Sequence, residues 1–165
     1  MQLPNREDSP AWELINGVPQ QKPMPTLHHS LLQKRLVNAV DGSGSEYEAF
    51  PELRCQLLKN SVVPDVTIVH RRRLPVGNQP VQGAPDWLIE ILSPDQSTTK
   101  LIAKIQTCIA EGSQLGWLID TEEHVVMVFQ GTQMRLVTGN ESLSVLSDMA
   151  LALTASELFG WLPSN

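Results

Sequence analysis

Two apolar stretches, "VVPDVTIVH" at residues 62–70 and "APDWLIEILSP" at residues 84–94, decide what kind of sheet this chain can form. Both have the length and composition of buried strands. Each carries an acidic residue, Asp65 in the first stretch and Glu90 in the second. Carboxylates are rarely buried unless they are paired or bound to a metal ion. The stretches therefore predict two strands of a central sheet and raise the question of what the carboxylates face.

Alternation along each strand shows which side chains share a face. Asp65 shares a face with Thr67, and Glu90 shares a face with Leu88. If the strands are neighbours, the two carboxylates lie on the same side of the sheet. Adjacent buried carboxylates repel, and a hard divalent cation such as Mg²⁺ (or Mn²⁺) relieves that repulsion. For Asp65, which follows Pro64, a turn-capping role stays open as the alternative.

Local signals predict the other elements. The dipeptide Asn16-Gly17 between apolar alternations predicts an N-terminal hairpin within residues 11–25. Three helices are expected, at residues 26–40, 97–112 and 154–162, and Thr154 and Glu157 have the spacing of a capping box at the start of the third. Four further short strands are expected, at residues 116–120, 124–130, 133–139 and 142–146. The predicted fold class is α/β, a central mixed β-sheet flanked by helices with an N-terminal β-hairpin.

The bulk composition limits the class of protein. The 165 residues, 41% hydrophobic and 18% charged, suit one globular domain spanning residues 1–165. The net charge of −6 argues against a general nucleic-acid coat protein, but not against an enzyme with one local basic patch. No apolar run reaches the ~18 residues of a membrane span, and the N-terminus lacks the order of a signal peptide. Because Cys55 and Cys108 have no paired spacing, we expect free thiols and a cytoplasmic location.

A basic group on the helix predicted at residues 97–112 would complete a metal site. The apolar stripe of this helix consists of Leu101, Ile102, Ile105, Cys108 and Ile109. Lys104 lies roughly 100° from the centre of the stripe, and its stem is long enough to reach across the packed face. Lys100 lies roughly 140° away and is expected in solvent. A solvated role stays open as the alternative for Lys104.

The chain resembles the Uma-type putative restriction endonucleases, a bacterial group within the PD-(D/E)XK nuclease superfamily. Five segments carry the resemblance, in the family's order: "WELINGVP", "MPTLHHSLLQKRL", "SVVPDVTIV", "APDWLIEILSP" and "KIQTCIAEGSQLGWLID". The resemblance implies a restriction-endonuclease-like core and Mg²⁺-dependent (or Mn²⁺-dependent) cleavage of DNA phosphodiester bonds. The family's aromatic residue on the second helix is replaced here by Cys108.

The resemblance also implies roles for single residues. Asp65 and Glu90 would be the metal ligands and part of the catalytic set. The superfamily's lysine two residues after the Glu is absent, because Leu92 stands there. The family's lysine on the following helix corresponds to Lys104. Glu13 falls on the family's N-terminal acidic position and would be a further catalytic residue, although a cross-strand ion pair is an equal alternative.

Two groups are candidates for contacts with nucleic acid. His29 matches the family's His at the start of the first helix, where it could instead cap or pack the helix. Arg71, Arg72 and Arg73 form a basic loop that could contact phosphates, but a solvated loop is the favoured interpretation. A homodimer would suit a duplex substrate, since two-fold symmetry matches two strands.

Three functions remain open from the sequence. The first, which we favour, is a metal-dependent endodeoxyribonuclease, because both acidic residues and a candidate lysine occur together. The second is a catalytically weak or inactive nucleic-acid-binding or protein-interaction module on the same fold. The third is a purely structural, oligomer-forming protein in which Glu90 pairs with a buried Arg or Lys.

Overall fold

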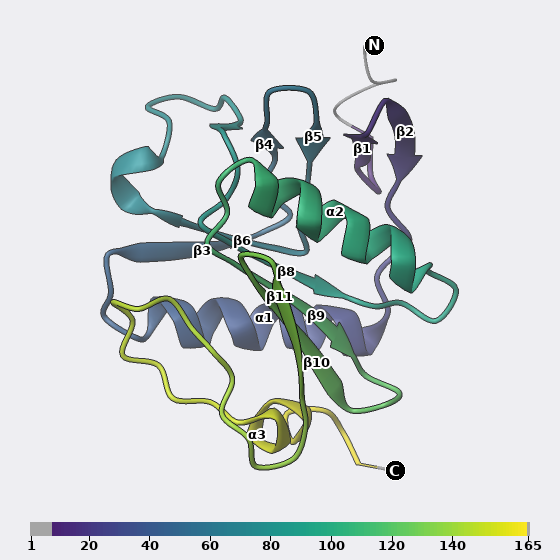
Figure 1. The fold of residues 1–165 in the computed structure, drawn as a ribbon, viewed down its shortest axis with the longest axis vertical. Coiled ribbons are helices and arrows are strands. Elements are labelled where there is room, and N and C mark those ends of the chain that lie inside the picture. The colour runs from purple at the N-terminus through teal and green to yellow at the C-terminus, as the bar shows by residue number, and fades with distance from the viewer. Residues whose placement is uncertain (1–7, 165) are drawn as a thin grey trace.

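Six strands form the central sheet of the computed structural model, which describes residues 8–164 (Figure 1). Their order across the sheet is β11-β10-β9-β8-β6-β3. Strands β8 and β9 are parallel and the other neighbours are antiparallel, so the sheet is mixed, as predicted. The bounds are β3 Tyr47–Pro51, β6 Val66–His70, β8 Trp87–Ile91, β9 Leu115–Asp120, β10 Val125–Gln130 and β11 Gln133–Val137.

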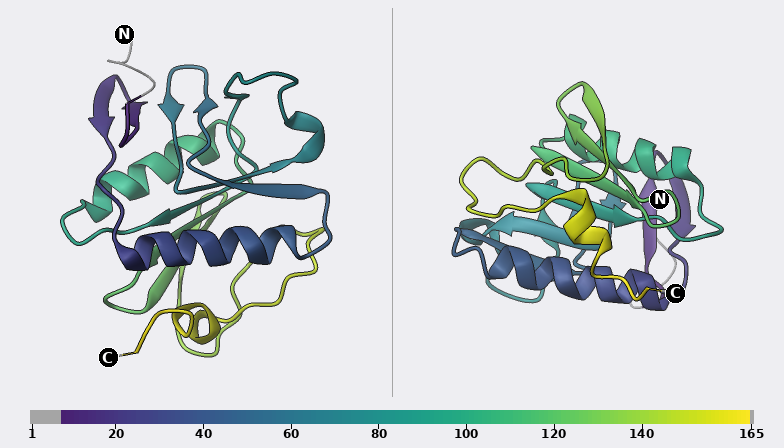
Figure 2. Two further views of the ribbon diagram at one scale, coloured as in Figure 1. Left: turned by 180° about the vertical axis from the view of Figure 1, so that it is seen from behind. Right: turned by 90° about the horizontal axis from the view of Figure 1, so that it is seen from below.

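Helices cover both faces of the central sheet, as the view from below in Figure 2 shows. Helix α1 (Leu27–Asp41) packs against β3 and β6, and helix α2 (Thr98–Ala110) packs against β9 and β10. The short helix α3 (Ala155–Phe159) belongs to the same core as α1. The capping box predicted for α3 is present, with Thr154 and Glu157 bonded to each other's backbone.

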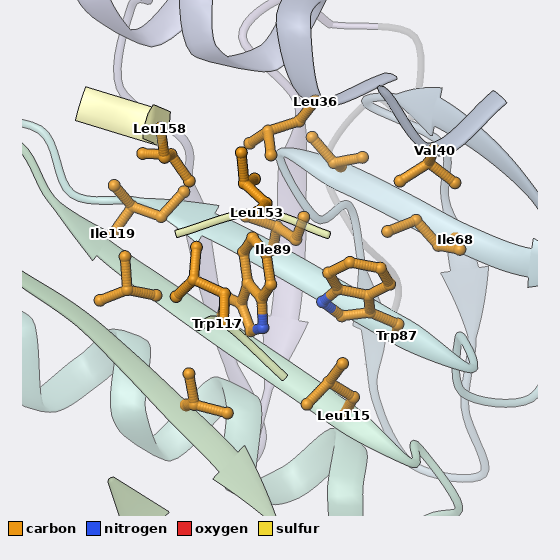
Figure 3. Close-up of a cluster of buried hydrophobic side chains, with 14 of the residues drawn as sticks. Leu36, Val40, Ile68, Trp87, Ile89, Leu115, Trp117, Ile119, Leu153 and Leu158 are labelled. Atoms are coloured by element: carbon orange, nitrogen blue, oxygen red, sulfur yellow. The ribbon is translucent and has the colours of Figure 1, made fainter. Parts of the chain in front are cut away.

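The core between the sheet and α1 contains two fully buried tryptophans. Trp87 from β8 and Trp117 from β9 meet edge to face, with ring centroids 4.8 Å apart (Figure 3). Leu36 from α1 and Leu158 from α3 approach the sheet from the helix side. Every residue of β8 is buried. Glu90 is therefore held in a strand that is packed on both faces.

Five short strands form a second sheet, which the sequence does not predict as a sheet. Its order is β2-β1-β5-β4-β7. It contains the predicted hairpin, in which Asn16 and Gly17 both adopt the positive φ that a type I′ turn requires. Its bounds are β1 Trp12–Ile15, β2 Val18–Gln21, β4 Cys55–Gln56, β5 Ser61–Val62 and β7 Val81–Gln82.

The chain passes from the small sheet to the central sheet between β5 and β6. Ser61 of β5 pairs with β1, whereas β6 begins at Val66 and pairs with β3 and β8. Pro64 stands at the break, where its missing N–H costs no ladder hydrogen bond. Asp65 consequently lies at the seam where the two sheets meet.

Helix α2 connects β8 to the parallel strand β9 and packs closely on it. A Cβ atom at Gly116 would lie 2.5 Å from Cγ2 of Ile105, which is closer than such atoms can approach. The absence of a side chain at this position therefore sets how closely α2 and its lysines approach the sheet.

Two predicted strands differ from the structure: the strand expected at residues 62–70 is interrupted at residues 63–65, and the strand expected at residues 142–146 is absent. Residues 142–146 are not a strand but an irregular segment with an isolated bridge between Ser142 and Thr154. The buried side chains of this segment, Leu143 and Leu146, are three residues apart, which does not match the two-residue period of a strand. The segment packs into the core as a loop instead.

Cys55 and Cys108 are both free, as predicted, and both are buried. Among the helices of residues 8–164, none has the length and apolar composition needed to cross a membrane.

Candidate active site

Asp65 lies immediately before β6, beside Glu90 of the neighbouring strand β8. The pairing of Val66 with Ile89 places Asp65 opposite Glu90. The Asp65 N–H donates a hydrogen bond to Glu90 Oε2 at 3.3 Å. Asp65 is 4% exposed and Glu90 is 1% exposed. The structure thus brings together the two acidic residues that were expected to lie close together if their strands were neighbours.

Both carboxylate oxygens of Asp65 accept hydrogen bonds or ion pairs. Oδ2 accepts from the N–H of Ile91 at 2.7 Å. Oδ1 lies 2.7 Å from Lys22 Nζ and 3.0 Å from His29 Nε2. Burial by itself raises the pKa of Asp65, but Lys22 and His29 outweigh burial and hold the pKa well below its ordinary value. Asp65 is therefore ionised at neutral pH.

Lys104 joins Glu90 to Glu13. Its Nζ lies 2.5 Å from Glu13 Oε2 and also contacts Glu90 Oε1. Glu13 Oε2 accepts a further hydrogen bond from the N–H of Val63 at 2.8 Å, which ties the N-terminal hairpin to the seam. Burial raises the pKa of Glu90 to about 8; Lys104 opposes this rise and Asp65 supports it. Glu90 consequently takes up a proton more readily near neutral pH than an ordinary glutamate does.

Lys104 is buried more deeply than helical geometry predicted. It is 1% exposed and lies on the buried face of α2, whereas Lys100 is exposed, as expected. Burial lowers the pKa of Lys104, but Glu13 and Glu90 more than offset this and raise the pKa above its ordinary value. Lys104 is therefore a permanent cation at neutral pH, able to donate hydrogen bonds but not to accept a proton.

Lys22 and Glu52 belong to the same cluster and were missed by the sequence analysis. Lys22 Nζ lies 2.9 Å from Glu52 Oε2. A signal for Lys22 was available, because the two-residue turn places it opposite Ala11 and so on the same face of the hairpin as Glu13. Glu52 directly follows β3 with a left-handed φ of 53°, and no sequence pattern marks it.

The candidates for nucleic-acid contact lie in two different places. His29 is 6% exposed and contacts Asp65, so it belongs to the buried cluster. Arg71–Arg73 form a 3-10 turn at the far end of β6 from Asp65. Arg73 is bound to Asp86 at 3.1 Å and to the Ala84 carbonyl at 2.7 Å, so it serves the local structure. Arg71 and Arg72 are exposed.

The composition of the cluster fits a divalent cation. Four carboxylates face two ammonium groups, which leaves an excess of two negative charges when all are ionised: Glu13, Glu52, Asp65 and Glu90 against Lys22 and Lys104. Glu90 Oε1 touches Lys104 but accepts no hydrogen bond of good geometry from residues 8–164. Asp65 also forms, with His29 and Glu52, a group whose potential ligand atoms lie within 4.8 Å of one another. Carboxylate oxygens are the ligands that Mg²⁺ and Mn²⁺ prefer.

A groove of about 770 Å³ leads to this cluster from solvent. It lies between the β1–β2 hairpin and the segment that begins α2. Its lining includes the buried Glu13, Lys22 and Lys104 and the exposed Lys100. Sites for small ligands typically span ~300–1,000 Å³, so the groove is large enough for a substrate group.

Comparisons with known proteins agree with this architecture. A crystal structure of a putative nuclease belonging to DUF820 from Anabaena variabilis is 37% identical to this chain, with a TM-score of 0.87. The match covers 94% of this chain and 93% of that chain, and it confirms the predicted fold class. A cryo-EM structure of a DrdV–DNA complex has 16% identity and a TM-score of 0.40 over 78% of this chain and 10% of that chain, and it carries no argument. No curated protein matches the chain. The family model described as Uma2, putative restriction endonuclease, matches residues 1–156, and the chain therefore belongs to the Uma2 family.

Proposed function

We propose that this protein is a metal-dependent endonuclease that hydrolyses phosphodiester bonds in DNA. The observation that carries the proposal is the meeting of Asp65, Glu90 and Lys104 at one point of the fold, with Glu13 beside them. Membership of the Uma2 family and the likeness to the putative nuclease from Anabaena variabilis support nuclease chemistry.

Asp65 and Glu90 would hold a Mg²⁺ or Mn²⁺ ion. Such an ion, when bound, activates a water molecule and stabilises charge on a phosphoryl oxygen. Asp65 is already ionised, because Lys22 and His29 lower its pKa. Glu90, whose pKa is raised to about 8, would have to lose its proton to become a ligand. Metal binding should therefore release a proton and strengthen as the pH rises towards 8.

Lys104 would act through its fixed positive charge. Because its pKa is raised, it remains an ammonium group, which suits it to orient the attacking water or to stabilise the pentacoordinate phosphate. Glu13 holds this ammonium at 2.5 Å and lines the groove, where it could also polarise the water or bind a second metal ion. The reaction adds one water molecule: its oxygen bonds to phosphorus, and the sugar oxygen leaves with a proton as a hydroxyl group.

A catalytically weak or inactive binding module is the second candidate, and one observation favours it. Lys22 and Lys104 already compensate the charge of Asp65 and Glu90, so the fold has buried ion pairs that do not need a metal ion. The pairing of Glu90 with a buried lysine is also what a purely structural role predicts. Measured binding of Mn²⁺ would argue against a structural role, and turnover of DNA would argue against a binding module.

The deciding experiment is a plasmid-nicking assay with Mg²⁺ or Mn²⁺, and with EDTA as the metal-free control. The wild-type protein should convert supercoiled plasmid to nicked or linear forms only when the metal is present. Asp65→Asn and Glu90→Gln should lose this activity together with Mn²⁺ binding, whereas Glu48→Gln, a half-buried carboxylate on β3, should retain both. Equal cleavage by Glu90→Gln and wild type would refute the proposed site.

A further inference from the structure

Lys22 occupies an unusual position for a lysine. It directly follows β2 and begins the irregular segment 22–26 that leads to α1, yet it is only 8% exposed. Its ammonium contacts three oxygen atoms, the Val63 carbonyl at 2.6 Å, Asp65 Oδ1 at 2.7 Å and Glu52 Oε2 at 2.9 Å. An ammonium group has three N–H donors, so these contacts use all of them. Lys22 thus sits among oxygen ligands as a bound cation would.

A divalent cation at Asp65 would compete with this ammonium. Oδ2 of Asp65 is occupied by the N–H of Ile91, and Oδ1 is shared by Lys22 and His29. Two cations drawn to the same oxygen repel strongly in a buried site, where the effective dielectric constant is low. One of the groups at Oδ1 must therefore leave, and the charged lysine on an irregular segment is the group that can move furthest.

The groove provides the place to which Lys22 can move. Lys22 lines it together with Lys100 and Lys104, so a rotation of its flexible stem would carry the ammonium into the groove without unfolding any strand or helix. Lys104 cannot do the same, because it is held on the sheet side by Glu13 and Glu90 and is fully buried in the face of α2.

We propose that Lys22 is a tethered counter-ion that holds Asp65 in the metal-free protein and turns into the groove when a divalent cation binds. There it contacts the phosphodiester group of the nucleic acid, as a phosphate-binding residue additional to Lys104. The second half of this inference rests on the proposed nuclease function, and the first half rests on the contacts of Lys22 alone.

The first test measures the reactivity of the lysines in the wild-type protein. An amine-acylating reagent is applied with and without Mn²⁺, and each modified lysine is identified by mass spectrometry. Lys22 should be protected without the metal and acylated with it. Lys100 should react in both conditions and Lys104 in neither, so these two lysines show the extent of acylation expected for an exposed and for a buried amine. Protection of Lys22 in both conditions, while Mn²⁺ binds, would overturn the proposal but leave the nuclease function standing.

The second test uses Lys22→Met, with Lys100→Met as the matched control. If Lys22 leaves Asp65 only ~10% of the time in the metal-free protein, its removal should tighten Mn²⁺ binding by roughly tenfold. At saturating Mn²⁺ the same variant should cleave plasmid more slowly, so affinity and turnover move in opposite directions. Lys100→Met should leave the Mn²⁺ affinity unchanged.

The outcomes separate the two proposals. An unchanged or weaker Mn²⁺ affinity in Lys22→Met would show that Lys22 is only a structural ion-pair partner. Tighter Mn²⁺ binding with an unchanged cleavage rate would refute the proposed contact between Lys22 and the phosphodiester group. If the wild-type protein binds Mn²⁺ but never cleaves DNA, the proposed function fails while the displacement of Lys22 is still decided by the acylation pattern. If Mn²⁺ does not bind at all, both proposals fall.

Discussion

Replacing Lys104 by Met should destabilise the metal-free protein by about 3 kcal/mol at pH 7, because the substitution removes the cation between two buried carboxyl groups. Removal of one partner of a buried ion pair typically costs ~3–5 kcal/mol. The lower end applies here, because Glu90 can take up a proton once Lys104 is gone. Met retains most of the stem of Lys104, so no large cavity adds to the cost.

Thermal unfolding in EDTA measures this effect. For a chain of this size a loss of 3 kcal/mol corresponds to a fall in melting temperature of roughly 6–12 °C. Lys100→Met, on the exposed side of the same helix, should change stability by no more than ~0.5 kcal/mol. Mn²⁺ should restore part of the stability of Lys104→Met but not its cleavage activity. A loss below ~1 kcal/mol would mean that Lys104 is not the counter-ion of this cluster and would refute the reasoning.

Three further outcomes are expected. Glu90 has its pKa raised from 4.5 to about 8 in the folded protein, so its protonated form contributes stability that is complete below pH 4.5 and is lost as the pH rises through about 8. In EDTA, the stability of Glu90→Gln relative to wild type should therefore rise as the pH increases from 5 to 9. A difference between the urea midpoints of the two proteins that stays constant over this pH range would contradict the raised pKa. If the exposed Arg71 and Arg72 contact phosphates, changing both to Gln should make the dependence of log DNA affinity on log salt concentration less steep, by roughly 0.9 per lost contact. An unchanged slope would show that neither arginine contacts phosphate. Gly116→Ala should cost ~1–3 kcal/mol in urea unfolding, because its Cβ would collide with Ile105, and a neutral result would show that α2 can shift away from β9.

Much of the fold follows from local patterns in the sequence. The Asn16-Gly17 turn, the capping box of α3 and the alternation in β8 each depend on residues close together in the chain, and each is present as predicted. The adjacency of Asp65 and Glu90 is also accessible from sequence, because it requires only that two consecutive long strands pair. The predicted strand at residues 142–146 failed, since a strand needs a partner and the sequence does not show whether a sheet edge is available.

The environment of the carboxylates was decided by tertiary structure. The charged groups around Asp65 and Glu90 come from three separate parts of the chain: Lys22 follows the hairpin, Glu52 follows β3, and Lys104 lies on α2. Local periodicity carries no information about contacts between such distant segments. Periodicity placed Lys104 at the edge of the packed face, because it ranks residues by hydrophobicity alone. The structure buries it instead, since Glu13 and Glu90 offset the cost of taking its charge out of water. Local patterns in the sequence thus indicate most of the elements and the two acidic residues that meet if their segments pair, whereas the balance of charge around these residues depends on long-range contacts that exist only in the folded chain.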